Sequence, residues 1–234
     1  MGNNCTEDFN YLEIYGNVTA LDTNRISIVH INEHTESRRV CIFGILDSEM
    51  GRKIKDEMLS WLTLEYDVYC VIQKEPGELY EYPALRFAQW LCETKNVDYL
   101  LYVHTKGAVF KNPTQKKIRQ LWKHEFTGKR ADEYVEYIMN DNYDVVCPLT
   151  GTNNQTWYNG MFVSKRAFSN IPEIKPSKDR YSYQRLFSSS SKIKGLLGYH
   201  ISSDRLTEYT LTLFNKYIET LSIDSNDVIF HIKY

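Results

Sequence analysis

The stretch Leu100-Leu101-Tyr102-Val103-His104-Thr105-Lys106-Gly107-Ala108 passes from an apolar run into three hydrogen-bonding residues and two small ones. A short, continuous apolar run is typical of a strand buried on both faces of a sheet. Beyond its end, His104 can donate or accept a proton, Lys106 carries a fixed positive charge and Gly107 permits close approach of the backbone. Taken alone, a polar strand end of this kind is more often an ordinary loop than a binding site.

Strand-like and helix-like segments alternate on both sides of this stretch. Strands are predicted at residues 40–46, 66–72, 97–103 and 143–149. Helices are predicted at residues 50–64, at a segment opened by Pro83, at a segment capped by Thr114 and ended by Gly128, and at about 130–140. This alternation predicts an α/β fold, a Rossmann-like, mainly parallel twisted sheet with helices on both faces.

The alternation of strands and helices does not extend to the two ends of the chain. Residues 10–32 predict two strands or a hairpin that turns at Asp22-Thr23-Asn24. Beyond residue 150 we expect a short strand at 160–163, a flexible loop at 188–191, a helix at 206–221 and an edge strand at 228–232. We therefore expect a single domain with terminal additions, divided into N-terminal strands and linker (1–39), a central core (40–186) and a C-terminal addition (187–234).

The charge balance excludes some classes of partner. The chain of 234 residues has 28 basic and 30 acidic side chains, so no global field draws it to nucleic acid or to an anionic membrane. An anionic ligand must then be held by a local site. No apolar run approaches the roughly 20 residues that span a bilayer. Met1-Gly2-Asn3-Asn4-Cys5-Thr6 matches the N-myristoylation pattern, which leaves a peripheral membrane contact open.

The cysteines indicate a reducing compartment. There are five, and no pair has the C-x-x-C spacing of zinc ribbons. An odd, scattered set favours reduced, buried thiols over a disulfide framework. The N-terminus has no charged-then-apolar secretory signal. We expect a cytoplasmic protein without disulfides.

Several common signatures are missing from the sequence. It has no G-x-G-x-x-G, no G-x-x-x-x-G-K-[ST], no G-x-S-x-G and no H-E-x-x-H, which disfavours a Rossmann dinucleotide site, a P-loop, an α/β-hydrolase and a zincin. Asp-x-Asp is also missing, so no carboxylate pair at a strand end is ready to hold Mg²⁺ or Mn²⁺. We therefore expect no metal site.

Residues 100–108 resemble the signature of bacterial polysaccharide-assembly glycosyltransferases with the GT-A fold, and in particular the glycosyltransferase-like rhamnan synthesis protein F family. Three further segments resemble that group in the same order, with the resemblance covering about residues 40–186. They are Leu121-Trp122-Lys123, Tyr143-Asp144-Val145-Val146 and the segment from Trp157-Tyr158-Asn159-Gly160-Met161-Phe162 through Ile171-Pro172. Two departures stand out: Gly160-Met161 replaces the usual Gly-Asn, and Tyr183-Gln184 falls where an acidic residue is common.

The resemblance implies transfer of a sugar from a nucleotide-diphosphate donor to a glycan or lipid-linked acceptor in surface polysaccharide assembly. In GT-A enzymes the third strand usually ends in Asp-x-Asp, which grips the diphosphate through a metal. Here the corresponding residues are His104, Thr105, Lys106 and Gly107. Lys106 is expected to neutralise the diphosphate directly, so Mg²⁺ or Mn²⁺ is possible but not favoured, and no other cofactor is implied.

The resemblance also implies positions for the rest of the donor and for the acceptor. The base and ribose fall at Phe43, Gly44 and Asp47, at the end of the first core strand. The sugar and acceptor fall beside Trp157, Asn159 and Gly160, and the nearest acidic candidates for a catalytic base are Asp179 and Glu173.

Two other readings remain open at this stage. A catalytically silent binding or scaffold protein with the same fold would explain the missing Asp-x-Asp and the presence of Gln184. An enzyme that uses His104 or Lys106 as a base or Schiff-base amine fits the residues but has no partner motif. Lys123 and His124 are expected on a solvated helix face.

Overall fold

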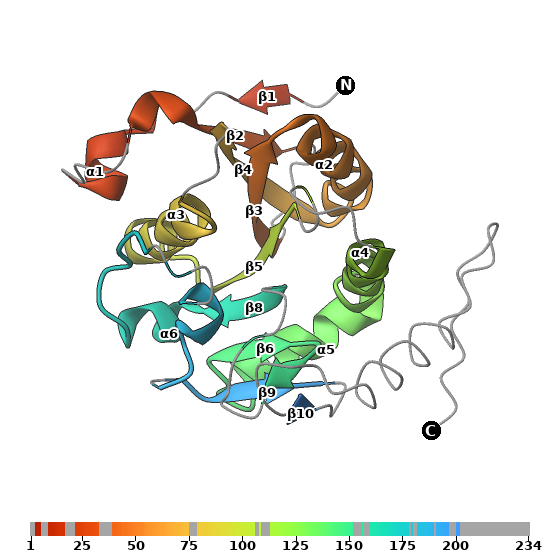
Figure 1. Ribbon diagram of the computed structural model, residues 1–234. Coiled ribbons are helices and arrows are strands. Elements are labelled where there is room, and N and C mark those ends of the chain that lie inside the picture. Colours follow the sequence, from red (N-terminus) through yellow and green to blue (C-terminus); the bar gives the residue numbers. More distant parts are fainter. Residues whose placement is uncertain are drawn as a thin grey trace.

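The computed structural model describes residues 3–5, 9–16, 22–32, 39–74, 79–105, 108, 113–151, 156, 160–177, 179, 182–189, 191–196 and 200–201. Within these residues an eight-stranded sheet is flanked by helices on both faces, and a second sheet has two strands (Figure 1). The strands are β1 (Asn3–Cys5), β2 (Ile26–Asn32), β3 (Arg39–Asp47), β4 (Tyr66–Lys74), β5 (Tyr99–His104), β6 (Val145–Cys147), β7 (Thr150–Gly151), β8 (Met161–Ser164), β9 (Ile193–Gly195) and β10 (His200–Ile201). The helices are α1 (Tyr11–Tyr15), α2 (Glu49–Leu62), α3 (Tyr82–Thr94), α4 (Pro113–Glu125), α5 (Gly128–Met139) and α6 (Lys165–Ser169).

The larger sheet has the strand order β1-β2-β4-β3-β5-β8-β6-β9. β3 pairs in parallel with both β4 and β5, and β8 is antiparallel to both β5 and β6. β3, β4, β5 and β6 therefore point the same way and end at one edge of the sheet. β1–β2 and β2–β4 are antiparallel as well, so the sheet as a whole is mixed, while the four core strands expected from the sequence run parallel to one another.

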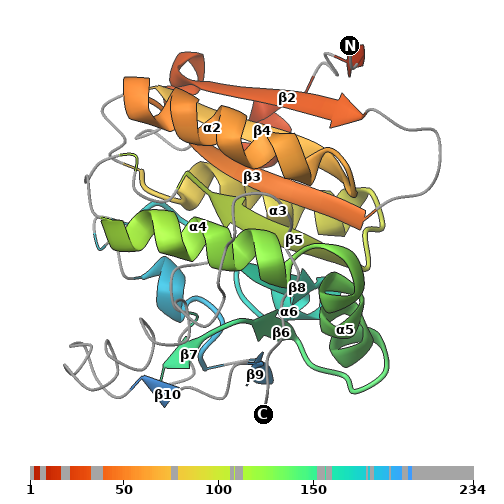
Figure 2. The same ribbon diagram turned by 90° about the vertical axis from the view of Figure 1, so that its right-hand side faces the viewer.

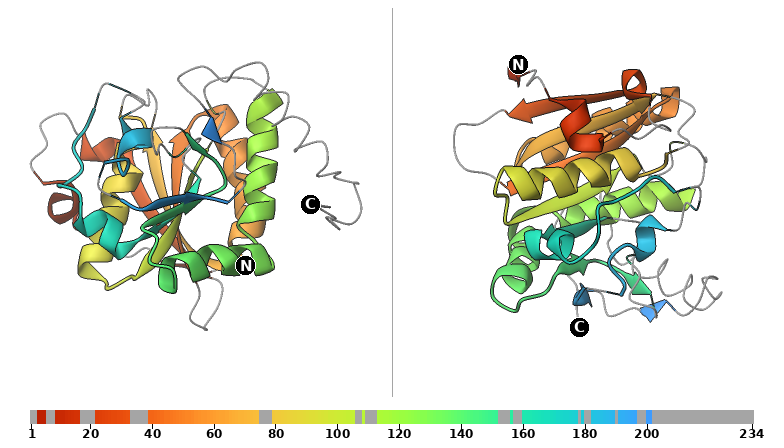
Figure 3. Two further views of the ribbon diagram at one scale, coloured as in Figure 1. Left: turned by 90° about the horizontal axis from the view of Figure 1, so that it is seen from below. Right: turned by 90° about the vertical axis from the view of Figure 1, so that its left-hand side faces the viewer.

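Two layers of helices cover the sheet. α1, α3 and α6 pack on one face, and α2, α4 and α5 pack on the other (Figures 1 and 3). Because alternate side chains of a strand point to opposite faces, Tyr102 of β5 belongs to the α3 side of the core while Val103 belongs to the α2 side. Figure 2 shows α2 and α4 lying side by side across one face, where Arg119 of α4 donates to Glu57 of α2 at 3.0 and 3.2 Å.

The helix starts follow local chemistry. Ser48 caps α2 by accepting a hydrogen bond from the Gly51 backbone N–H at 2.9 Å, and Pro83 lies in the first turn of α3, as the sequence predicted. The sequence predicted that Gly128 ends a helix, and the structure shows that it also begins the next one. It has a φ of +56° and is the first residue of α5, which follows α4 after a two-residue turn.

The N-terminal prediction was wrong in one respect. Residues 11–15 form helix α1 instead of a strand, because the Asn10 side chain accepts hydrogen bonds from the Leu12 and Glu13 N–H groups and so caps it. Ile14 and Tyr15 then bury fully against the α3 side of the core. The expected turn is a 3₁₀ turn at Thr23–Arg25, and the strand that follows it, β2, forms as predicted.

The remaining predictions concern the C-terminal half of the chain. The predicted strand at 143–149 is shorter, at β6, and β9 and β10 were not predicted. The helix expected at 206–221 and the strand expected at 228–232 lie outside the described residues. No helix of the described part of the chain is both long and apolar enough to cross a membrane.

The thiols agree with the sequence-based expectation. Cys41, Cys70, Cys92 and Cys147 are buried and free, while the side chain of Cys5 lies outside what is described. Burial raises the pKa of the Cys70 and Cys147 thiols to about 12, so both remain protonated and unreactive at neutral pH.

A buried carboxylate joins α4 to α5. Glu125 has no exposed side-chain surface and accepts hydrogen bonds at 2.8 Å from Arg130 and from the Tyr134 hydroxyl. His124 Nδ1 lies 2.8 Å from its other oxygen and is only 11% exposed, so the solvated position expected for His124 was wrong. Burial alone would raise the pKa of Glu125, but the bonds from His124 and Tyr134 and the charge of Arg130 outweigh it and lower the pKa.

We predict that Glu125→Ala lowers the free energy of unfolding by about 3–5 kcal/mol, because it leaves Arg130 without its buried partner. Urea denaturation at pH 7 measures this loss. The exposed partner of the same arginine, Glu133, supplies the control: Glu133→Ala is expected to cost less than about 1 kcal/mol.

The stability that Glu125 contributes also depends on pH. A carboxylate whose folded pKa is lowered stabilises the fold above its ordinary pKa, 4.5 for glutamate, and loses that contribution as the pH falls through the lowered value. The gap between the wild-type protein and Glu125→Ala should therefore narrow below about pH 4.5. A gap that stays constant down to pH 3 would contradict the role given to Glu125.

Candidate functional site

The chain reverses its direction of winding between β3 and β5. From β3 it passes through α2, on one face, to β4 on one side, and then through α3, on the other face, to β5 on the opposite side of β3. The carboxyl ends of β3 and β5 therefore form a topological switch point. Open α/β sheets bind their ligands at such points, because the two connecting helices diverge there.

Three of the predicted binding residues meet at this switch point. Gly44 of β3 pairs with His104, the last residue of β5. Thr105, only 6% exposed, donates its N–H to the Gly44 carbonyl at 2.9 Å and accepts the Leu46 N–H on its hydroxyl at 3.1 Å. Thr105 thus fixes the end of β5 against β3.

Gly44 allows helix α3 to approach the sheet closely. A Cβ at this position would lie 3.1 Å from Ala84 Cβ, 3.4 Å from His104 Cβ and 3.5 Å from the Tyr102 hydroxyl. Any side chain at residue 44 would therefore push the first turn of α3 away from the switch point.

The reversed strand β8 brings two more motif residues to the same edge. Because β8 is antiparallel to β5, its amino end lies beside the carboxyl end of β5, with Met161 opposite Tyr102. Gly160, just before β8, lies directly against Trp122 of α4, since a Cβ there would be 2.2 Å from the indole Nε1. The Trp122 ring centroid is in turn 5.6 Å from that of His104. Three segments quoted for the family resemblance thus meet in space.

Other predicted residues have different surroundings. Phe43 is fully buried in the core on the α2 side, so its side chain packs there. Asp47, the last residue of β3, pairs with Arg52 at 2.8 Å and stays partly exposed. Lys123 is exposed, as expected. Lys106, Gly107, Trp157 and Asn159 lie outside the described residues.

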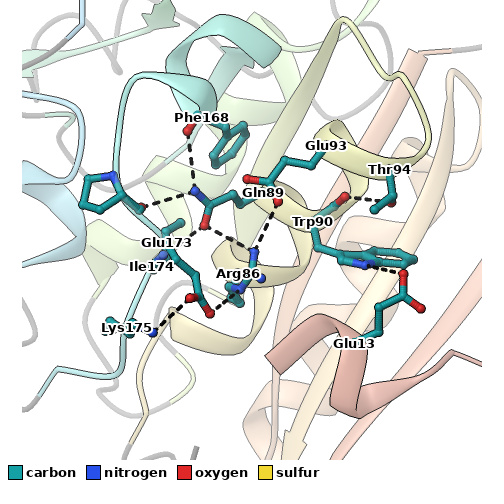
Figure 4. A network of polar contacts seen from close by, with 11 residues as sticks. Glu13, Arg86, Gln89, Trp90, Glu93, Thr94, Phe168, Glu173, Ile174 and Lys175 are labelled. Atoms are coloured by element: carbon teal, nitrogen blue, oxygen red, sulfur yellow. Dashed lines mark hydrogen bonds and ion pairs between the residues drawn. The ribbon is translucent and has the colours of Figure 1, made fainter. Parts of the chain in front are cut away.

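The two candidate bases are both paired with cations. Glu173 lies 2.9 Å from Lys175 and 3.5 Å from Arg86 of α3 (Figure 4). Asp179 pairs with Arg185. The hydrogen bond from Lys175 and the charge of Arg86, against a smaller opposing effect of burial, lower the pKa of Glu173. A carboxylate with a lowered pKa is a weak proton acceptor at neutral pH.

Gln89 of α3 holds the segment that carries Glu173. Its amide donates to the Phe168 and Pro172 carbonyls at 3.5 and 3.3 Å, and its oxygen accepts the Ile174 N–H at 2.9 Å (Figure 4). Glu173 is therefore anchored to the side of α3 through Gln89, about two turns from the amino end of the helix.

Sequence reasoning missed a buried tyrosine close to the switch point, Tyr102. Tyr102 lies two residues before His104 and on the same face of β5, and burial, with added repulsion from Glu81 and Tyr183, raises the pKa of its hydroxyl. Period-2 alternation counted back from His104 could have indicated that Tyr102 faces α3. Within the described residues no group of three or more His, Cys, Asp or Glu side chains is arranged to hold a metal ion.

Comparison of the chain with protein-family models, with curated proteins and with solved structures finds no match in any of the three.

We predict that Gly160→Ala destabilises the protein by about 1–3 kcal/mol, because the new methyl group must displace the Trp122 indole. Trp122→Leu removes the obstructing ring, so the double variant should be more stable than the sum of the two single losses predicts. Thermal unfolding of the four proteins measures this coupling. Additive losses would show that the two residues do not press on each other in solution.

Proposed function

We propose that the protein is a glycosyltransferase that moves a sugar from a nucleotide-diphosphate donor to a glycan or lipid-linked acceptor in surface polysaccharide assembly. Its core would be of the Rossmann-like GT-A type. One observation carries the proposal: the switch point of the sheet coincides with the Gly44–His104 pair, directly before Lys106 and Gly107. The predicted binding segment is therefore where the topology favours a ligand.

The chemistry of glycosyl transfer sets three requirements. The nucleoside must be gripped, the diphosphate leaving group must be neutralised, and the acceptor hydroxyl must be oriented or deprotonated. We assign the second task to Lys106, since an ammonium group near the leaving oxygens stabilises their developing charge as a metal ion does. A lysine also repels Mg²⁺, so divalent metal is not expected to be required.

The acceptor would lie towards Trp157, Asn159 and Gly160. Of these, Gly160 packs directly against the Trp122 indole. Asp179 and Glu173 are the proposed bases. Each already pairs with a cation, so it must leave Arg185 or Lys175 before it accepts a proton.

We also propose a cytoplasmic location, which the buried free thiols support.

We predict that uridine, guanosine or deoxythymidine diphosphate binds the protein in the presence of EDTA, and that Lys106→Ala weakens this binding about ten- to a hundredfold. The loss follows from removing one charge-assisted contact to the diphosphate. Isothermal titration calorimetry measures it. Lys95→Ala is the matched control. Lys95 is an exposed lysine at the carboxyl end of α3, away from the switch point, so its replacement should leave the affinity for the nucleoside diphosphate unchanged.

Binding that requires Mn²⁺ and survives Lys106→Ala would overturn the metal-free account. Release of free nucleoside diphosphate from a nucleotide sugar then separates an enzyme from a silent binding protein of the same fold.

A further inference from the structure

The larger sheet ends at β9, whose outer side pairs with no strand of the described part of the chain (Figure 1). On its inner side, the Lys192 carbonyl and the Leu196 N–H hydrogen-bond to the backbone of β6 at 3.3 and 3.1 Å. Successive residues of a strand in a parallel pair bond alternately to the two sides of the strand. The N–H and C=O groups of Ile193 and Gly195 therefore point away from β6, towards the outer edge.

Two lysines of this edge lie against the rings of two tyrosines. Lys192 and Lys194 share a face of β9, on the side of α5, because alternate side chains of a strand point the same way. The Lys192 ammonium is 4.0 Å from the Tyr143 ring centroid. That of Lys194 is 4.3 Å from the Tyr137 centroid and 5.2 Å from the Tyr143 centroid. The two rings meet edge to face, so together they hold both ammonium groups beside the edge.

The positive charge of this pair is not balanced by the rest of the described chain. Within the described residues, neither Lys192 nor Lys194 forms an ion pair, and Lys192 donates to the Asp141 backbone carbonyl at 3.0 Å. The nearby carboxylate of Asp144 is already bonded to Arg166 and to the Lys192 backbone N–H. Two neighbouring ammonium groups repel each other, and an anionic partner relieves that repulsion.

Lysines on an edge strand often serve to prevent pairing with other chains. That role requires their ammonium groups to extend past the edge. In β9 the ammonium groups turn back towards Tyr137 of α5 and towards Tyr143, which lies just before β6. They therefore do not extend over the outward groups of Ile193 and Gly195.

We propose that β9 is a docking edge for an extended acidic peptide segment of a partner protein, which adds a strand to the sheet and places two carboxylates against Lys192 and Lys194. The outward backbone groups of Ile193 and Gly195 hold the segment, and the lysines select its side chains. The two carboxylates lie two residues apart, because residues with that spacing share a strand face. The proposal is independent of the proposed function, since β9 lies at the edge of the sheet and not at the switch point between β3 and β5.

The experiment measures peptide binding to the full chain by fluorescence anisotropy. The probe is a fluorescein-labelled Val-Glu-Val-Glu-Val amide. It is compared with the Val-Lys-Val-Lys-Val amide and with the acidic peptide N-methylated at its three central residues. We expect the acidic peptide to bind at least tenfold more tightly than the lysine peptide. N-methylation should weaken its binding at least tenfold, because it removes the backbone donors that pair with the edge.

The lysines are tested by the double variant Lys192→Gln/Lys194→Gln. It should weaken binding of the acidic peptide about tenfold, the effect of losing two ion pairs near the surface, and make the remaining binding less sensitive to salt. Lys95→Gln is the matched control, since Lys95 is an exposed lysine at the end of α3, on the opposite face of the sheet. It should leave binding unchanged.

Carbodiimide cross-linking, which joins an amine to a carboxylate in contact with it, identifies the occupant of the edge. Links from Lys192 or Lys194 to the glutamates of the peptide support the proposal. Links to a carboxylate of residues 202–234, or to a second copy of the chain, would show a different occupant and overturn it. Failure of the acidic peptide to bind, equal binding of the N-methylated peptide or unchanged binding by the double variant would overturn it as well.

Discussion

Parallel pairing on both sides of β3 constrains the rest of the molecule. Parallel neighbours cannot be joined by hairpins, so each connection must cross the sheet through a helix. The chain makes two such crossings in opposite directions, with α2 on one face and α3 on the other. The two crossings create a switch point at the carboxyl ends of β3 and β5, where Gly44 and His104 lie side by side.

Close contacts at glycines maintain this arrangement. Gly44 lets α3 approach the sheet, and Gly160 lets Trp122 of α4 cover the start of β8. The buried Glu125 at the end of α4 fixes that helix to α5 through Arg130 and Tyr134. The surroundings of His104 therefore depend on the α4–α5 junction, through the contact of His104 with Trp122 of α4.

Periodicity in the sequence predicts the elements of the core but not their directions. β3, α2, β4 and α3 form close to where the apolar spacing and Pro83 indicate them, because each buries a regular apolar face. β8 is buried along its whole length, so its run of apolar residues gives no indication of the direction of the strand. The antiparallel pairing of β8 could therefore not be predicted from the sequence. Helix α1 was missed because its five residues are too few for a helical period, and its cap, Asn10, is also a common turn residue.

The residues of the candidate site could likewise be predicted only in part. His104 and Gly44 could be expected at one sheet edge, since both follow apolar runs of parallel strands. The environment of the Tyr102 hydroxyl, which has no hydrogen-bond partner among the described residues, could not, because such partners are side chains brought together only by the fold.

The antiparallel pairing of β2 with β4 gives the N-terminal region a structural role that the division at residue 40 does not suggest. β2 covers the outer edge of β4, while Tyr15 of α1 donates to the Pro83 carbonyl in the first turn of α3 at 3.0 Å. A shortened protein that began at β3 would therefore expose the backbone of a nine-residue strand to solvent. Such open edges pair with other chains, so this truncation would promote aggregation rather than release a smaller stable domain.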